Sequence, residues 1–409
     1  MKNYQRFLNY VRIPTASDPN SASHPSTLVQ MNLSKVLVEE LRELGIADAT
    51  MDKRGYVYGT VKSNTEKPID VIGFIAHVDT SCDASGENIK PRIISNYDGE
   101  DVLLNEKPNI VMKTSEFPFL KKLKGQSLIV TDGTTLLGAD DKAGIAEIMG
   151  MIQYFSEHPE VPHGEIKIAF TPDEEIGSGP MFFDVKGFNA KFAYTIDGGK
   201  EGVINFENFN AASCEVSIKG INIHPGDAKN HMKNSLLIAM EFNRMLPEAM
   251  IPAHTELYEG FNHLNNLIGD VEKTKMHYII RNHDKALFLK QKAEMIRIQD
   301  FLNEKYGPDT VEVKLTDSYY NMRDIVKDHM EIVDIAAKAT EMAKVPVVFS
   351  PIRGGTDGAQ LTYKGLICPN LGTGGYNFHG RFECITIEAL DKVTEILVNI
   401  VKIVAQQKK

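Results

Sequence analysis

Three short apolar runs stand out in the first half of the chain, and each ends abruptly in polar or charged residues. They are VIGFIA, IKIAF and FAYTI, at residues 71–76, 166–170 and 192–196. Unbroken apolar runs of this length are typical of strands that are buried on both faces of a parallel sheet. Between the first two runs, residues 142–158 carry apolar side chains at helical spacing. This alternation predicts an α/β fold in which a mixed, mostly parallel sheet is flanked by helices.

From about residue 209 the pattern changes to alternating strands and longer helices. Their order, β-α-β-α-β, predicts a smaller, compact α+β unit. The expected strands cover residues 212–220, 276–281 and 311–316, and the expected helices cover residues 235–246 and 284–307.

After about residue 320 a helical pattern returns, at residues 330–343 and 387–407, on either side of a Gly-rich segment at residues 353–380. The glycines of that segment favour turns that form a site over a flexible linker. We therefore predict an α/β domain interrupted by an inserted α+β domain. The α/β domain comprises residues 1–208 and 321–409, and the inserted domain comprises residues 209–320.

The composition limits the classes of function. With 409 residues, 42% apolar and 24% charged, the chain is long and apolar enough for two or three globular domains. Its 55 acidic and 45 basic residues give a net charge of −10 without a basic stripe, which argues against a nucleic-acid partner. No stretch reaches the roughly 18 apolar residues of a membrane span, and the N-terminus lacks a secretory pattern. We therefore expect a cytoplasmic protein without a membrane partner.

The cysteines restrict the kind of metal site that this chain can build. Cys82, Cys214, Cys368 and Cys384 are scattered and include no CxxC pair. This spacing argues against both a thiolate zinc site and a disulfide framework. Any metal site must then use histidine and carboxylate side chains.

The first apolar run leads into His77-Val78-Asp79. Because side chains alternate along a strand, residues two apart project from the same face, so His77 and Asp79 can share a site. A hydrogen bond from the His77 ring to the Asp79 carboxylate would fix the tautomer of that ring. A surface or structural role explains this pair equally well when the pair is considered alone.

Paired carboxylates follow at two further places. Asp140 and Asp141 precede the expected helix, at a strand-to-helix turn of the kind where open α/β sheets usually bind ligands. Helix capping explains one aspartate but not two, which leaves Asp140 free to bridge metal ions. Glu174 and Glu175 follow the second run, and neighbours in extended backbone point to opposite sides. We expect one glutamate to bind metal and the other to hold water, although a solvated acidic turn also explains the pair.

Asp197 and His379 complete the candidate set. Asp197 follows the third run within IDGG, and His379 lies in the Gly-rich segment. A turn and an exposed loop are the ordinary explanations of these two residues. Together, however, the fragments supply two histidines and several carboxylates, nearly all at the ends of expected parallel strands. Nitrogen and oxygen ligands without thiolate suit zinc, with manganese or cobalt as alternatives.

The strings GFIAHVDT, LLGADDKAG, TPDEEIG, YTIDGG and NFHGRFE together resemble the co-catalytic zinc aminoacylase and carboxypeptidase family of metallopeptidases, and its aminotripeptidases in particular. The resemblance extends from the N-terminus to the last helix. It implies two Zn²⁺ ions per chain with Asp140 as the bridging ligand. His77 and Asp197 would complete one metal site, and Glu175 and His379 the other.

The resemblance also implies roles for residues that bind no metal. Asp79 would orient His77, and Glu174 would be the general base that takes a proton from the attacking water. The inserted domain would act as a lid and could pair with a second copy to form a homodimer. Within it, His224 would stabilise the oxyanion, although an ordinary turn before Pro225 explains this histidine too.

Two arginines resemble the residues with which this family binds the carboxylate of a small peptide. They are Arg281, in YIIRNHD, and Arg353, in SPIRGGTDG. A guanidinium group suits a bidentate contact with a carboxylate. Gly354 and Gly355 leave room beside Arg353, whereas Arg281 is also explained as an exposed charge at a strand end.

The activity that the resemblance implies is release of the N-terminal residue from tripeptides by metal-activated water. A dipeptidase or an N-acyl-amino-acid amidohydrolase of the same fold is the alternative. A non-catalytic metal-binding protein on the same scaffold is a third hypothesis. Loss of a ligand or of the base is the usual mark of such a protein, and this sequence has all five proposed ligands and Glu174.

Overall fold

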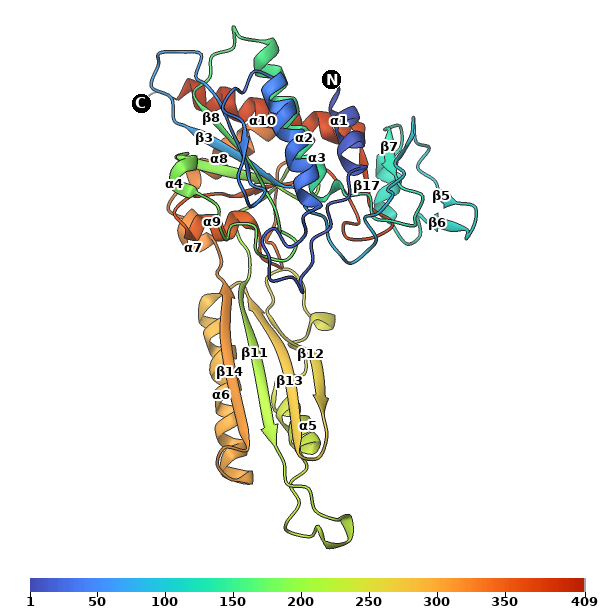
Figure 1. The fold of residues 1–409 in the computed structure, drawn as a ribbon, viewed down its shortest axis with the longest axis vertical. Coiled ribbons are helices and arrows are strands. Elements are labelled where there is room, and N and C mark those ends of the chain that lie inside the picture. Colours follow the sequence, from blue (N-terminus) through green and yellow to red (C-terminus); the bar gives the residue numbers. More distant parts are fainter. Residues whose placement is uncertain (408–409) are drawn as a thin grey trace. The chain divides into compact units, whose positions relative to one another are not determined.

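A computed structural model describes residues 1–407, which form two compact units (Figure 1). The first unit contains Met1–Phe206, Ile325–Ser350 and the chain from Thr356 onward. The second contains Glu207–Asp324 and the short segment Pro351–Gly355. Residues 209–320 thus fall within the second unit, and Pro351–Gly355, which the sequence places with the first domain, groups with the second.

An eight-stranded sheet forms the centre of the first unit. Strands β8, β3, β9 and β16 are mutually parallel. Strand β2 pairs antiparallel with both β1 and β8, and β10 pairs antiparallel with β16 but parallel with β15. All residues of β3 are buried, so both faces of the sheet are covered. The expected mostly parallel sheet is therefore confirmed. In spatial order the strands are β1 (Thr50–Met51), β2 (Val57–Val61), β8 (Ile166–Thr171), β3 (Ile72–His77), β9 (Phe192–Ile196), β16 (Asn370–Leu371), β10 (Val203–Asn205) and β15 (Val348–Phe349).

Helices pack on this sheet and on one another. The expected helix after residue 142 is α3 (Ala139–Glu157), which contacts β3 and β9 and packs against α1 (Asn3–Val11). The last expected helix, α10 (Ile387–Gln406), packs against α3 and α8 (Met330–Met342). The remaining helices of the chain outside the inserted segment are α2 (Gln30–Glu43), η1 (Pro118–Leu123), α4 (Val185–Phe188), α7 (Arg323–Val326) and α9 (Asp357–Tyr363).

A satellite structure of very short strands is formed by four strands between β3 and α3 in the sequence and by β17 near the C-terminus. It consists of a three-stranded antiparallel sheet, β17-β7-β4, and a hairpin, with its own cluster of buried side chains. The sequence does not predict it, because three or four residues are too few to show a clear period. Its strands are β4 (Arg92–Ile94), β5 (Val102–Asn105), β6 (Ile110–Met112), β7 (Leu128–Val130) and β17 (Cys384–Thr386).

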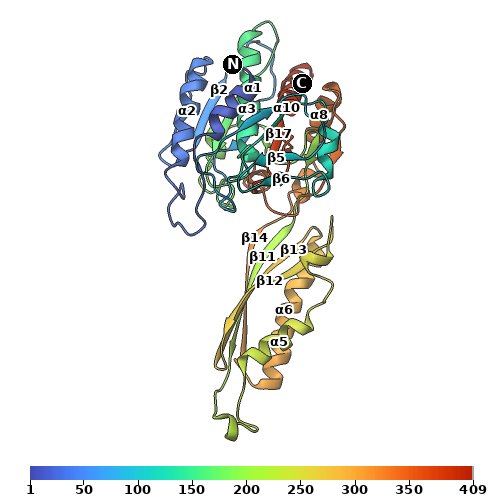
Figure 2. The same ribbon diagram turned by 90° about the vertical axis from the view of Figure 1, so that its right-hand side faces the viewer.

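The second unit is an antiparallel sheet with two helices on one of its faces (Figure 2). Buried and more exposed residues alternate along β11 and β13, as expected for a sheet that covers a core on one side. The expected strands and helices of this region are confirmed. In spatial order the strands are β12 (Phe261–Gly269), β13 (Lys273–Asn282), β11 (Asn210–Lys219) and β14 (Val311–Tyr319), and the helices are α5 (Ser235–Met245), η2 (Pro225–Asp227), η3 (Pro252–His254) and α6 (Lys285–Tyr306).

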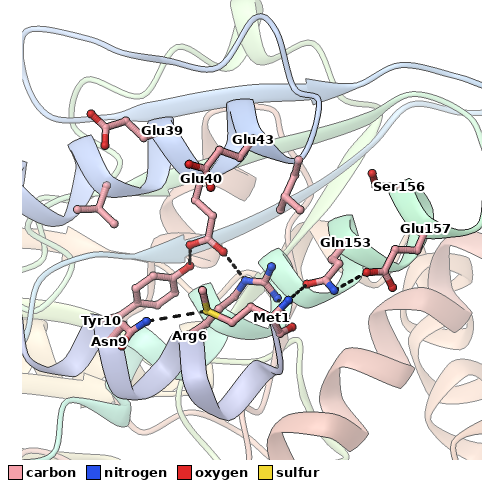
Figure 3. A pocket seen from close by; sticks show the side chains of 12 residues that line it. Met1, Arg6, Asn9, Tyr10, Glu39, Glu40, Glu43, Gln153, Ser156 and Glu157 are labelled. Carbon is pink, nitrogen blue, oxygen red and sulfur yellow. Dashed lines mark hydrogen bonds and ion pairs between the residues drawn. The ribbon is translucent and has the colours of Figure 1, made fainter.

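A cavity of about 530 Å³ lies among α1, α2 and α3 in the first unit (Figure 3). Glu40 of α2 connects this helix to α1. It accepts a hydrogen bond from Tyr10 at 2.5 Å and forms an ion pair with Arg6. None of the predicted site residues lines this cavity. Across residues 1–407, no helix is both long enough and apolar enough to cross a membrane.

Gly144 allows the start of α3 to approach the end of β9 closely. A Cβ atom at this position would lie 2.1 Å from the main-chain oxygen of Ile196 and 2.6 Å from Oδ1 of Asp141. We expect Gly144→Ala to lower the free energy of unfolding by about 1–3 kcal/mol, the usual cost of overpacking, in a urea titration. A matched variant in the same helix is Gly150→Ala, whose Cβ would meet only the end of the Asn3 side chain. If both variants were equally stable, close packing at Gly144 would not matter.

Candidate metal centre

The ends of two neighbouring parallel strands bring the first group of candidate ligands together. His77 is the last residue of β3, and Asp197 directly follows β9. Nε2 of His77 lies 2.9 Å from Oδ1 of Asp140 and 3.5 Å from Oδ1 of Asp197. Each of these three side chains offers one ligand atom, and these three atoms lie within 4.8 Å of one another. They are close enough to bind one metal ion together.

A second group shares Asp140 with the first. Nε2 of His379 lies 2.9 Å from Oε2 of Glu175 and 3.4 Å from Oδ2 of Asp140. Asp140 therefore presents one carboxylate oxygen to each group. The structure brings together all five residues that the sequence suggests as ligands, in two sets of three with one common member.

Asp140 reaches this position through an irregular start of α3. Its backbone has φ −84° and ψ 104°, so the residue lies outside the regular helix. Asp141 takes the capping role, because its Oδ1 accepts the N–H of Gly144 at 3.3 Å. Its Oδ2 accepts the main-chain N–H of His77 at 3.1 Å. The turn before α3 does not follow a strand of the main sheet, contrary to what an open α/β sheet would predict. The preceding strand, β7, belongs to the satellite sheet.

Glu174 and Glu175 lie in a turn, so the extended backbone assumed for them is wrong. Asp173 has φ +61°, and the N–H of Gly177 donates to the oxygen of Glu174 at 2.7 Å. The two side chains nevertheless have different contacts. Glu175 contacts His379, whereas Glu174 belongs to neither ligand group.

Asp79 supports this turn as well as His77. Its two carboxylate oxygens accept the main-chain N–H groups of Glu174 and Glu175, at 3.0 and 3.2 Å. Nδ1 of His77 lies 3.0 Å from the main-chain oxygen of Asp79 and 3.3 Å from Oδ1. These contacts leave Nε2 of His77 directed at Asp140 and Asp197.

Asp83 contacts His379 in the candidate site, and the sequence analysis does not identify this residue. Its Oδ2 lies 3.3 Å from Nδ1 of His379, on the side of the ring opposite Glu175. A carboxylate in this place orients a metal-binding imidazole and makes it more basic. No strand or helix period marks Asp83, and its only signal is that it follows the HVDT string by three residues.

The site concentrates buried acidic groups. Burial raises the pKa of Glu175 to about 7, against the hydrogen bond to His379. Burial also raises the pKa of Asp197 and, strongly, those of Glu174 and Asp141. Oε1 of Glu175 is buried and has no hydrogen-bond partner among the described residues.

For the histidines and Asp140, the pKa shifts favour the charged form. Hydrogen bonds to Asp140 and Glu175 raise the pKa of His379 to about 11. Burial alone would raise the pKa of Asp140, but hydrogen bonds from His379 and His77 hold it below its usual range. The contacts with the two histidines thus favour the ionised form of Asp140, and a cation at either group centre would do the same.

The three candidates for substrate binding lie in the second unit. The His224 side chain is exposed and caps η2, where its Nδ1 accepts the N–H of Gly226. Nη1 of Arg281 donates to the main-chain oxygens of Ala212 and Ile280. Arg353 stacks over Phe261, the cross-strand partner of Arg281. The two arginines therefore lie at the same end of this sheet.

The terminal nitrogens of Arg353 have main-chain partners in this structure. Nη1 donates to the oxygens of Leu257 and Glu259 at 2.9 and 2.8 Å. Nη2 donates to the main-chain oxygen of Thr255 at 3.3 Å and to its side-chain Oγ1 at 3.0 Å. Arg353 thus ties down the 255–259 loop within its own unit.

A family model described as peptidase family M20/M25/M40 matches residues 128–403, which is more than half of the 409 residues. The chain belongs to this peptidase family. Membership confirms the resemblance on which the expected roles rest, and the matched segment contains Asp140, Glu174, Glu175, Asp197 and His379.

Several relatives in the family match this chain over nearly its full length. Peptidase T of Caldanaerobacter subterraneus subsp. tengcongensis is 54% identical over 402 residues, which is 98% of each chain. Peptidase T of Halothermothrix orenii is 52% identical over 99% of each chain.

Solved structures share the fold of this peptidase-family chain. The aminopeptidase PepT from Bacillus cereus superposes with a TM-score of 0.79 at 24% identity, over 99% of this chain and 98% of that one. A dinuclear metal binding peptidase of the M20 family from Bacillus subtilis has a TM-score of 0.66 at 16% identity, over 99% of each chain. These structures confirm the α/β fold.

Replacement of Asp79 tests whether its carboxylate holds the glutamate turn. Asp79→Asn leaves one acceptor for two buried N–H groups that now use separate oxygens. We expect the free energy of unfolding to fall by about 1–3 kcal/mol, the cost of a buried donor without a partner. Chemical denaturation of metal-free protein measures this change.

Asp52→Asn is the matched control. Asp52 also accepts two main-chain N–H groups, those of Arg54 and Tyr56, but both bind the same oxygen, Oδ1. An asparagine can keep both bonds, so little loss is expected. Equal losses in the two variants would contradict a special role for Asp79.

Proposed function

We propose that this chain is a zinc-dependent aminopeptidase that removes the N-terminal residue from tripeptides. The observation that carries the proposal is the pair of ligand groups that share Asp140. Relatives called Peptidase T, more than 50% identical over almost the whole chain, support the substrate class. The structural neighbour described as a dinuclear metal binding peptidase supports two metal ions per chain.

The residues of the two groups fit divalent cations. The donors are imidazole nitrogen and carboxylate oxygen without thiolate, a set that suits zinc and also accommodates manganese or cobalt. Oε1 of Glu175, buried without a hydrogen-bond partner among the described residues, fits a position next to a cation. His77, Asp140 and Asp197 would hold one ion, and Asp140, Glu175 and His379 the other.

In the proposed reaction Glu174 moves the proton. When bound by these two groups of residues, zinc would supply a water of pKa lowered to about 7 and a Lewis acid for the peptide carbonyl. Glu174 accepts the proton of the attacking water and passes it to the leaving amine, so its carboxyl must be free of the ligand groups. The bond from its main-chain N–H to Asp79 fixes the base at its backbone.

The second unit supplies the proposed substrate contacts. Arg281 and Arg353 would bind the peptide carboxylate, and His224 would stabilise the oxyanion. The present partners of Arg353 are neutral oxygens of the 255–259 loop, which an ionised carboxylate would replace with stronger hydrogen bonds. We retain the roles of this unit as a lid and as a homodimer contact, and the cytoplasmic location, as parts of the proposal.

A comparison of three substrates separates the proposed activity from its alternatives. We expect zinc-loaded protein to hydrolyse Ala-Ala-Ala with at least tenfold higher kcat/KM than Ala-Ala, because a site that holds the terminal carboxylate would misplace the scissile bond of a peptide of another length. N-acetyl amino acids should react slowest. Chromatography of the released amino acid measures each rate. Faster hydrolysis of Ala-Ala would favour a dipeptidase, and faster hydrolysis of the acetylated compounds would favour an amidohydrolase.

Glu174→Gln separates the general base from the ligands. We expect kcat on the tripeptide to fall by about 10²–10⁴-fold, the range for loss of a general base. Metal content, measured by atomic emission, should stay at the wild-type value because Glu174 lies outside both groups. Glu160→Gln, at an exposed carboxylate beside His158, is the control and should change neither quantity. Loss of metal from Glu174→Gln would show that this residue is a ligand instead.

A further inference from the structure

Glu383 is a buried carboxylate that binds only main-chain groups of the loop before Asp140. Its Oε2 accepts the N–H groups of Leu137 and Gly138, both at 2.7 Å. Its Oε1 accepts the N–H of Asp140 itself at 3.0 Å. The side chain is 2% exposed. Three donors within four consecutive residues thus converge on one carboxylate.

These three hydrogen bonds hold a backbone segment that does not have regular helical geometry. Gly138 has φ +77°, and Asp140 lies outside the regular helix. Leu137 and Ala139 are fully buried, so water has little access to replace a lost acceptor. Each buried N–H without a partner costs about 1–3 kcal/mol, so removal of the carboxylate favours a different path for this loop.

The segment that carries Glu383 also carries His379. A pair of main-chain bonds between Tyr376 and Cys384, at 2.8 and 3.0 Å, closes this segment into a turn. Within it, the N–H of Glu383 donates to the oxygen of Gly380 at 3.1 Å. One closed turn therefore contacts Asp140 twice, through His379 at the carboxylate and through Glu383 at the backbone.

We infer that Glu383 is a positioning residue that sets the affinity of both metal positions by holding the main chain of Asp140. This inference rests on the proposed metal centre. Asp140 offers one oxygen to each ligand group, so a small shift of its backbone changes both groups together. Glu383 does not touch either group centre, and its effect passes through Asp140 alone.

Glu383→Gln is the informative variant, because it keeps the size and shape of the side chain. Glutamine has one acceptor oxygen, which can serve Leu137 and Gly138, while its NH₂ group then faces the N–H of Asp140. Two donors oppose each other at that point, and the Asp140 backbone must move. Loss of such an indirect support of a metal ligand typically costs 10–100-fold in metal affinity.

The experiment measures cation binding directly. Protein freed of metal by a chelator is titrated with Zn²⁺, and separately with Co²⁺, in a calorimeter. We expect Glu383→Gln to bind both cations about 10–100-fold more weakly than wild type. In the zinc-loaded enzyme, kcat should fall while KM for the tripeptide stays within about twofold, since substrate contacts are unchanged.

Glu388→Gln is the matched control. Glu388, five residues further along, also binds main chain with its carboxylate, because both oxygens accept the N–H of Ser127 at 3.1 and 2.9 Å. It supports β7, not the Asp140 loop. We expect Glu388→Gln to bind both cations with wild-type affinity. If removal of any negative charge in this region weakened cation binding, both variants would lose affinity.

Each outcome bears on the inference. Wild-type cation affinities in folded Glu383→Gln would overturn it. If that variant does not fold, Glu383→Asp, which keeps both oxygens on a shorter side chain, is titrated under the same criterion. Wild-type protein that binds two cations but leaves tripeptides intact would overturn the proposed function alone, because the comparison of affinities uses no turnover.

Discussion

Asp140 belongs to both ligand groups, and several other carboxylates lie close to it. The surrounding structure must stabilise this concentration of negative charge. Asp197 and Glu175 accompany Asp140, Asp141 follows it in the chain, and Glu174 interacts electrostatically with Asp197 and Glu175. Carboxylates in a poorly solvated site repel one another and lose hydration, so such a cluster is unfavourable without compensation. Hydrogen-bond contacts with His77 and His379 provide part of that compensation, and the donor geometry suits divalent cations for the rest.

A second set of carboxylates meets the constraint differently, through main-chain N–H groups. Asp79 binds the turn after β8, Asp141 binds the end of β3, and Glu383 binds the start of α3. Each of these bonds joins segments that lie far apart in the sequence. Backbone donors also stabilise the ionised state of the carboxylates that they contact. The same bonds therefore hold the ligand loops at fixed positions and make the surrounding negative charge tolerable.

Much of the sheet and most of the ligands can be predicted from the sequence, for reasons that also mark the limits. Strands β3, β8 and β9 are buried on both faces and leave unbroken apolar runs, and polar residues at their ends place His77 and Asp197. The polar strand β12 escapes prediction, because most of its residues are exposed and it shows no apolar alternation. Asp83 and Glu383 escape for another reason. Their partners are an imidazole and main-chain groups brought close only by the fold, and such contacts leave no spacing in the sequence.

The sequence predicts different roles for Glu174 and Glu175 from an extended backbone that the structure does not have. Alternation along a strand would separate their side chains, but the residues lie in a turn. The separation has a different origin: one carboxylate, Asp79, binds the N–H groups of both glutamates with separate oxygens, and the turn then directs only Glu175 to His379. Because Asp79 also contacts Nδ1 of His77, a single side chain supports a proposed ligand of each metal position and the proposed base. The Asp79 hydrogen bonds therefore hold the proposed metal ligands and the proposed base relative to one another without regular secondary structure at the glutamates.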